Sequence, residues 1–354
     1  MVPRRRESHD LFYPVFHPVA CETSQPSHPS EAIAALWAVR CHYWFISSST
    51  WTGVEASVTF PGPVWPLGTL SVLRRGGGDP CLVIAQDGAI WKTSMMASGP
   101  VTARITTSAP EVVDCEAWGD GAAEFADSLP AVLGADDDAT GFAPEEPTIA
   151  AAQRKAPHLR LGRTGRVLEA LIPAVLEQRV AGADSFRSWR LLVTKFGAPA
   201  PGPAPARMRV PPSAEVWRRI PSWEYHRANV DPGRARTVVG CAGRAPSLER
   251  LTSRVAESAR HALTSLPGVG VWTAAETAQR AFGDADALSI GDYHLAKVIG
   301  WTLLGHPIDD AQMVRLLEPL RPHRYRAVRL LEVSGLARNP RFGPRQAIRN
   351  LAGI

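Results

Sequence analysis

The sequence predicts an α+β N-terminal domain, consisting of an antiparallel sheet with helices, followed by an all-α domain. Two observations support this fold class. Short runs of β-branched residues alternate with turn signals between residues 56 and 140, and apolar residues recur with a helical period from Val167 onward. Apolar residues make up 45% of the 354 residues, so each of two domains can bury its own core.

The predicted boundaries follow changes in composition along the chain. Residues 1–55 mix Pro, Ser and His without a clear period, and we expect a poorly ordered extension there. We then expect the α+β domain at 56–140 and an acidic, proline-containing linker at 141–158. The all-α domain is expected at 159–338, before a basic C-terminal tail at 339–354.

Within the first domain, the runs GTLSVLRR, CLVIAQ, AIWKTSMM, VTARITT and VVDCEAW predict strands. The dipeptide Asp87-Gly88 lies between two of these runs and predicts a hairpin. GAAEFADSLPAVLG predicts a helix that closes the domain. In the second domain, apolar positions predict helices from Val167, over 185–196 and over 247–264.

The net charge of +5 is unevenly distributed. Up to Arg160 the chain has 11 basic and 18 acidic residues, and beyond it 28 basic and 16 acidic, which gives −7 and +12. A basic half indicates either a polyanionic partner or a solvated arginine-rich surface.

The five cysteines are widely spaced, so we expect neither a disulfide framework nor an iron-sulfur cluster. Prolines interrupt the apolar stretch near the N-terminus, and Ala32–Ile46 is too short to cross a bilayer. We therefore expect a cytoplasmic protein with no membrane partner, associated with the nucleoid if it is bacterial.

The segment SLPGVGVWTAAETAQRAFG lies between two helical patterns and predicts a tight hairpin followed by a helix near Val271. Gly268 and Gly270 can adopt positive φ and allow an anion close to the backbone. The backbone N–H groups at the helix start favour a phosphate, a contact that ignores base sequence. Alternatively, the glycines only allow two helices to pack closely.

Farther along, LSIGDYHLAKVIGW places Asp292 directly before a helix-forming run. An aspartate at this position ordinarily caps the helix. One helix and a short loop separate it from the hairpin, so a phosphate held there would bring a nucleoside near this carboxylate. Capping and catalysis are compatible roles.

These residues resemble the helix-hairpin-helix (HhH-GPD) DNA glycosylase superfamily, in which a catalytic aspartate follows the hairpin by some twenty residues. The resemblance runs from about Val167 to Leu331 and is strongest in LPGVGVWTA and GDYHLAKV. Among the subfamilies, the chain is most similar to DNA-3-methyladenine glycosylase II. It implies Asp292 as the catalytic carboxylate, an alkylated purine as substrate and damaged double-stranded DNA as partner. A monomer is expected, because one lesion needs one pocket.

Lyase-active relatives carry a lysine where this chain has Trp272, so the resemblance implies a monofunctional enzyme that needs no cofactor. Trp272, Glu276 and Tyr293 are the expected substrate-binding residues. Trp272 could stack on a cationic base or be a core residue. Glu276 could attract that base or point away from it.

The resemblance also implies DNA contacts at the hairpin, at the first interhelical turn and near residue 324. The expected residues are Leu266, Pro267, Gly268, Val269, Gly270, Thr273, Arg179, Arg324 and Tyr325. Arg179 matches the residue that wedges into the base stack, with a phosphate contact as the alternative. His323, Arg324, Tyr325 and Arg326 could instead form a solvated helix face.

By the same resemblance, the backbone carbonyls of Thr264, Leu266 and Val269 would hold a structural monovalent cation, Na⁺ or K⁺. Two other functions remain open. The chain could be a non-catalytic DNA-binding module that kept the hairpin, or a glycosylase for a deaminated or oxidised base.

Overall fold

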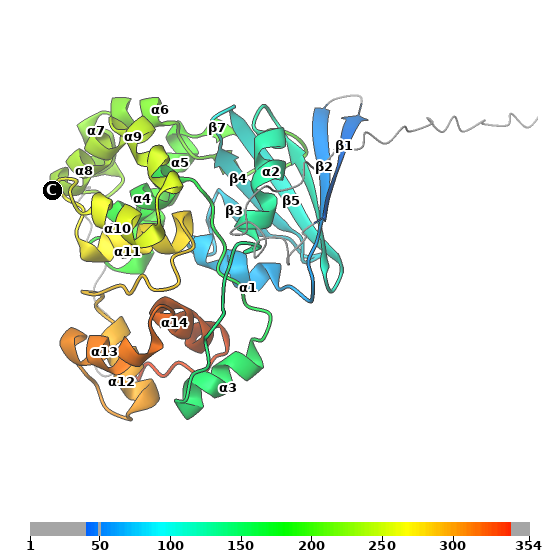
Figure 1. Ribbon diagram of the computed structural model, residues 1–354. Coiled ribbons are helices and arrows are strands. Elements are labelled where there is room, and N and C mark those ends of the chain that lie inside the picture. Colours follow the sequence, from blue (N-terminus) through cyan, green and yellow to red (C-terminus); the bar gives the residue numbers. More distant parts are fainter. Residues whose placement is uncertain (1–39, 49–50, 341–354) are drawn as a thin grey trace, which may run out of the picture. The chain divides into compact units, whose positions relative to one another are not determined.

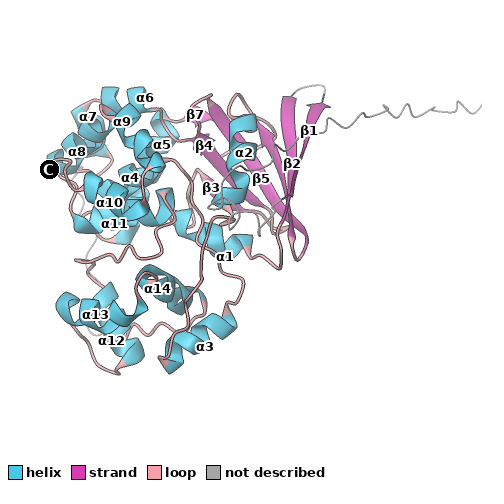
Figure 2. Cartoon of the chain, in the orientation of Figure 1, coloured by secondary structure: helices cyan, strands magenta, loops and turns pink. Residues whose placement is uncertain are grey.

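The computed structural model describes residues 40–48 and 51–340. It contains a six-stranded antiparallel sheet with the strand order β1-β2-β6-β5-β4-β3 and many helices (Figures 1 and 2). The strands of this sheet are β1 (Arg40–Ser48), β2 (Trp51–Thr59), β3 (Leu82–Ile84), β4 (Ile90–Met95), β5 (Pro100–Ala109) and β6 (Val112–Trp118). The predicted combination of antiparallel sheet and helices is therefore confirmed.

The sheet begins earlier than predicted. Strands β1 and β2 pair along their whole length, from Arg40 opposite Thr59 to Ser48 opposite Trp51. The prediction of a poorly ordered extension through residue 55 is therefore wrong for the strand residues after 39, while residues 1–39 lie outside the described part. Strand β2 also pairs with β6, so its order comes from a partner distant in sequence.

The segment GTLSVLRR was predicted to be a strand, and this prediction is wrong. Most of it lies in two short helices, α1 (Pro66–Leu70) and η2 (Ser71–Leu73). Pro66 occupies the first helical position, where its fixed φ favours helix initiation. The hairpin at Asp87-Gly88 is present between β3 and β4, with Gly88 at φ 83°. Helix α2 (Ala122–Val132) covers the sheet as predicted and buries Phe125 and Leu129.

The first group of helices packs around an apolar core centred on helix α4 and carries the hairpin. Its elements are α4 (Val167–Leu176), α5 (Gly182–Phe196), α6 (Ala214–Arg219), α7 (Ser222–Arg227), α8 (Pro232–Ala242), α9 (Ala245–Glu249), η3 (Arg250–Ser253), α10 (Ala256–Leu263) and α11 (Val271–Ala281). The helix predicted over 247–264 is thus divided into three pieces. Two short strands, β7 (Ala198–Pro199) and β8 (Arg209–Val210), also lie within the region predicted to be all α.

A second apolar core joins helices from distant parts of the chain. It contains α3 (Pro147–Lys155), α12 (Leu295–Leu303), α13 (Asp310–Leu317), η4 (Glu318–Leu320) and α14 (Arg324–Val333). Figure 1 shows α3 beside α14, and residues of the two helices share this core. Because Ile149 and Ala152 are fully buried there, the prediction of a linker over 141–158 is wrong.

Buried ion pairs also fix α14. Arg326 donates to both carboxylate oxygens of Asp137 at 2.6 and 2.9 Å, and both side chains are 4% exposed. Arg324 is 5% exposed and donates to Asp286 at 2.7 and 2.8 Å. These arginines therefore cannot reach a phosphate, which corrects the predicted DNA contact of Arg324 and the suggested one of Arg326.

The substitution Arg326→Met should lower the free energy of unfolding by about 3–5 kcal/mol, because it leaves Asp137 buried without its partner. Chemical denaturation of both proteins measures this change. The same replacement by Met at the exposed Arg219, which pairs with Glu215 on the surface, should change the free energy of unfolding by less than about 1 kcal/mol. Equal effects of the two substitutions would contradict the structural role of the Asp137 pair.

No helix within residues 40–48 and 51–340 is both long enough and apolar enough to cross a bilayer. Cys81, Cys115 and Cys241 are buried and unpaired. In the same part of the chain, no three His, Cys, Asp or Glu side chains gather as a metal-binding group.

Candidate active site

The hairpin between α10 and α11 is anchored by apolar side chains and exposes its backbone. Val269 is 5% exposed and belongs to the core around α4, against which Leu266 also packs. Pro267, Gly268 and Gly270 are exposed. The structure therefore divides the predicted contact residues into two that hold the hairpin and three that can face a ligand.

The two glycines serve different purposes. Gly268 has φ 83°, and a Cβ atom there would lie 2.1 Å from the Thr237 hydroxyl oxygen, so glycine is required twice over. Gly270 has an extended φ of −92°, which corrects the expectation of a positive value. A Cβ on Gly270 would meet no atom within 4 Å, so its glycine leaves open space in front of α11.

Helix α11 begins without a capping side chain and without an acidic residue in its first turn. The N–H groups of Val271, Trp272 and Thr273 have no intrahelical partner, as in the first turn of any helix. They adjoin the open space at Gly270, so this end of the helix can accept an anion. The Thr273 side chain itself is buried, so only its backbone could make the predicted DNA contact.

Gln178 connects the hairpin to the turn between α4 and α5, and the sequence analysis missed it. Its side-chain amide donates to the Gly268 carbonyl at 2.9 Å and to the Thr273 hydroxyl at 2.8 Å. The next residue, Arg179, is exposed and has φ 56°, an unusual conformation for a non-glycine residue. Gln178 thus fixes the predicted wedge residue next to the hairpin.

Asp292 is held by three N–H groups. One carboxylate oxygen accepts from the backbone of His294 at 2.8 Å and of Leu295 at 2.9 Å, and the other accepts from the Trp272 indole at 3.1 Å. These contacts have the pattern of a helix cap, although α12 begins at Leu295 with His294 at the N-cap position and no capping side chain there. The Asp292 carboxylate also lines a cavity, so these contacts do not remove it from possible chemistry.

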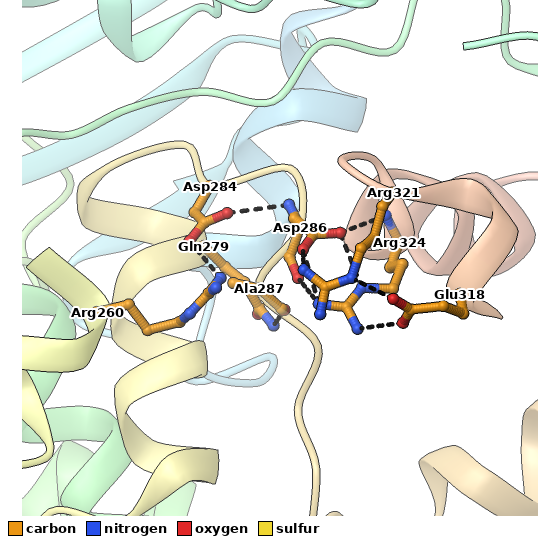
Figure 3. A network of polar contacts seen from close by, with 8 residues as sticks. All are labelled: Arg260, Gln279, Asp284, Asp286, Ala287, Glu318, Arg321 and Arg324. Carbon is orange, nitrogen blue, oxygen red and sulfur yellow. Dashed lines mark hydrogen bonds and ion pairs between the residues drawn. The ribbon is translucent and has the colours of Figure 1, made fainter. Parts of the chain in front are cut away.

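The loop that leads to Asp292 is tied down on two sides, as Figure 3 shows for its first half. Asp284 binds Arg260 of α10 at 2.5 Å, and Asp286 binds Arg321 and Arg324. Farther along the loop, the Gly291 N–H donates to Asp310 of α13 at 3.0 Å. These contacts fix the backbone that carries Asp292 between the two groups of helices.

The cavity has a volume of about 180 Å³ and is formed by α11, the loop before Asp292, α12 and α14. Its lining residues with polar side chains are Glu276, Gln279, Arg280, Ser289, Asp292, His294, Tyr325, Arg329 and Glu332. Three carboxylates and two guanidinium groups give this lining a net charge of −1 with His294 neutral. Of these residues, only Asp292, Glu276 and Tyr325 were expected to function, and Tyr325 in a different role.

Glu276 belongs to a hydrogen-bonded group in the cavity wall. Its carboxylate accepts from Arg280 at 2.8 Å and from the Ser289 hydroxyl at 2.5 Å, and Ser289 in turn accepts from Gln279 at 2.8 Å. Burial disfavours the charge on Arg280, but the nearby charges, Glu276 first among them, and the hydrogen bond to Glu276 together outweigh it, so the pKa of Arg280 lies above its usual value. Glu276 thus lines the cavity instead of pointing away, in the form of an ion pair.

The other predicted substrate residues are placed differently. Trp272 is half-buried and does not line the cavity, because its indole lies against Asp292. Tyr293 is 73% exposed, stacks edge-on with His294 and receives the Lys297 ammonium 4.4 Å from its ring centre. Tyr325 is 5% exposed and lines the cavity, which corrects its predicted contact with the DNA surface.

Replacing Trp272 with Phe should slow any reaction that uses Asp292 by about tenfold, because a hydrogen bond to a charged group contributes roughly 1.5–3 kcal/mol. Single-turnover kinetics on lesion-containing duplex DNA measure this rate. Affinity for undamaged duplex should stay unchanged, since the backbone N–H of residue 272, at the start of α11, is kept. A rate equal to that of the wild type would show that the indole N–H does not orient the carboxylate.

No family model matches the chain. Its sequence is 30% identical over 170 residues to the probable bifunctional transcriptional activator/DNA repair enzyme AlkA of Mycobacterium tuberculosis, in two strains. The match covers 44% of this chain and 32% of the relative, so the chain spans about a third of that protein's length.

Three solved structures share the fold at low sequence identity. A 3-methyladenine DNA glycosylase from Archaeoglobus fulgidus matches with a TM-score of 0.65 and 15% identity, over 79% of this chain and 98% of that one. MBOgg1, in complex with a low-affinity DNA ligand, matches with a TM-score of 0.63 and 14% identity, over 83% of this chain and 98% of that one. An 8-oxoguanine glycosylase/lyase from Clostridium acetobutylicum matches with a TM-score of 0.62 and 11% identity, over 82% of this chain and 97% of that one. The resemblance read from the hairpin and Asp292 is thereby confirmed: the chain has the fold of the helix-hairpin-helix DNA glycosylases, and its sequence is similar to AlkA.

Proposed function

We propose that this chain is a monofunctional DNA glycosylase that releases damaged bases, alkylated purines in particular, from double-stranded DNA. The observation that carries the proposal is the position of Asp292, which lines a cavity of about 180 Å³ one helix away from an anion-accepting hairpin. The similarity to AlkA and the shared fold support the same assignment.

The DNA backbone binds first in this scheme. A phosphate sits at the N–H groups of Val271 and Trp272, where Gly270 leaves room for it. Because the target atom is hidden inside a duplex, the damaged nucleotide rotates out of the stack at a cost of a few kcal/mol. Arg179, exposed and fixed beside the hairpin through Gln178, occupies the space that the nucleotide leaves or binds a neighbouring phosphate.

The same hairpin has carbonyl groups suited to the expected monovalent cation. Among the described residues, the carbonyls of Thr264 and Val269 accept no hydrogen bond, whereas that of Leu266 accepts one from the Val269 N–H at 3.0 Å. Oxygen ligands of this kind fit Na⁺ or K⁺. The cation would hold the hairpin in shape and take no part in the chemistry.

Asp292 then acts on the sugar of the extruded nucleotide. As the bond between C1′ and the base nitrogen breaks, the base leaves with the bonding electrons and the sugar becomes positively charged. The fixed carboxylate of Asp292 stabilises that charge. Water adds to C1′ and loses a proton, so the products are the free base and an abasic site.

The cavity suits a base that is already cationic. Its lining has a net charge of −1, which favours an N-alkylated purine over its neutral parent. Such a base also leaves without an added proton, so no general acid is needed. An enzyme that forms a Schiff base with the sugar needs a lysine, but no lysine lines this cavity and Trp272 stands at the lysine position of lyase-active relatives.

Strand cleavage tests the monofunctional assignment directly. The purified chain is incubated with methylated duplex DNA, and borohydride is added to trap any Schiff base. We expect free base and alkali-labile abasic sites, with neither trapped protein nor nicked strands. Trapped protein–DNA adducts would show that a lysine acts as nucleophile, and would assign the chain to the glycosylase/lyases.

A further inference from the structure

The Tyr325 hydroxyl differs from the other buried or half-buried polar groups in the cavity wall, of which the exposed His294 is not one. The side chains of Glu276, Gln279, Arg280, Ser289, Asp292, Arg329 and Glu332 all make hydrogen bonds within the protein. Tyr325 is 5% exposed, yet its hydroxyl has no hydrogen-bond partner among the residues that the structure describes. Its oxygen is not one of the fully enclosed unpaired polar atoms of the described residues, so water reaches it in the free protein and a bound molecule could replace that water.

Tyr325 lies on α14, whereas Asp292 precedes α12, and the cavity lies between these elements. The hydroxyl therefore faces the same space as the candidate catalytic carboxylate. Burial raises the pKa of Tyr325 to about 12, so its hydroxyl stays protonated at neutral pH and can both donate and accept.

We propose that the Tyr325 hydroxyl hydrogen-bonds to the edge of the extruded base and thereby helps to select which damaged purines are released. This inference rests on the proposed glycosylase function. A purine edge carries amino donors and carbonyl or ring-nitrogen acceptors, and one hydroxyl can pair with either kind. The effect is a selection among bases, because Tyr325 lines the cavity, whereas the hairpin residues do not.

The test compares the wild type with Tyr325→Phe, which keeps the ring and removes only the hydroxyl. Single-turnover release of free 3-methyladenine and 7-methylguanine is measured from separate duplexes. We expect release of the two bases to slow unequally, with the more affected base slowed by about 10- to 100-fold. Affinity for a duplex with a stable abasic-site analogue should stay within twofold, since that site contains no base.

Thermal unfolding of the free protein separates recognition from a structural role. Because the Tyr325 hydroxyl has no partner in the free protein, Tyr325→Phe should leave the Tm unchanged or raise it. Tyr225→Phe is the matched control, because that buried hydroxyl donates to the Trp217 carbonyl at 3.0 Å. The control should lower the Tm.

Two outcomes overturn the inference alone. In one, Tyr325→Phe releases each base at a rate within twofold of the wild-type rate while Asp292→Asn is inactive, so the hydroxyl has no part in selection. In the other, Tyr325→Phe lowers the Tm as much as the control does, so the hydroxyl is structural. A wild type that releases no base from either duplex instead overturns the proposed function, and this inference with it.

Discussion

Replacement of Asp292 by Asn is expected to slow base release by on the order of 10³-fold, because a neutral amide cannot balance the positive charge that develops on the sugar. The amide oxygen can still accept the N–H groups of His294 and Leu295, so these contacts at the start of α12 survive. The change should therefore affect catalysis far more than folding. Single-turnover release from alkylated duplex measures the rate.

The control for this variant is DNA binding. Asp292 does not belong to the hairpin, so Asp292→Asn should bind lesion-containing duplex at least as tightly as the wild type. Thermal unfolding should show only a moderate decrease in Tm, because the amide oxygen keeps the backbone contacts while the NH2 group cannot accept the Trp272 indole N–H. Release that falls less than tenfold, in a variant that is folded and binds DNA, would show that another group stabilises the transition state.

The second large effect concerns the hairpin. Gly268→Ala should lower the free energy of unfolding by roughly 2–4 kcal/mol and weaken duplex binding, because φ is 83° and the new Cβ would overlap the Thr237 hydroxyl. The Gln178 contact to the Gly268 carbonyl would move as well. Chemical denaturation and DNA titration at fixed salt measure the two consequences.

Gly270→Ala is the matched comparison, because its φ of −92° suits alanine and its Cβ would meet no protein atom. Its stability should equal that of the wild type, while a phosphate held in the open space would be displaced and duplex affinity would fall. Unchanged affinity in a stable Gly270→Ala protein would place the DNA backbone elsewhere.

Local signals predicted the parts of the site that lie close together in sequence. The hairpin was recognisable because Gly268 and Gly270 lie directly before a helical period, and Asp292 because it precedes another. The sheet strands β3 to β6 and helix α2 followed from the same kind of short-range pattern. Each of these features depends on a few neighbouring residues.

The features that the sequence did not predict depend on long-range contacts. Strands β1 and β2 were missed because β2 is held in the sheet by β6, far away in sequence, and β1 joins the sheet only through β2. Residues 147–155 were assigned to an acidic, proline-containing linker, since the apolar side chains that α3 buries, Ile149 and Ala152, are few. Arg324 and Arg326 looked like surface charges, because their partners Asp286 and Asp137 lie far away in sequence.

The cavity shows the same limit. Gln279, Ser289 and Arg329 carry no sequence motif that would mark them, and they meet only when α14 packs beside α11 and the loop before Asp292. Tyr325 was assigned to the DNA surface because its neighbours along the chain are basic. Its burial in the cavity wall became visible only from the folded arrangement.

If the proposed function is right, this chain breaks an N-glycosidic bond with Asp292. The most direct measurement is chromatographic detection of free 3-methyladenine and 7-methylguanine released from methylated duplex DNA by the wild-type protein, with Asp292→Asn as the blank. We expect release by the wild type and almost none by the variant. No release by a wild-type protein that is folded and binds the duplex would contradict the proposed function, and would identify the chain as a DNA-binding module or a glycosylase for a different lesion.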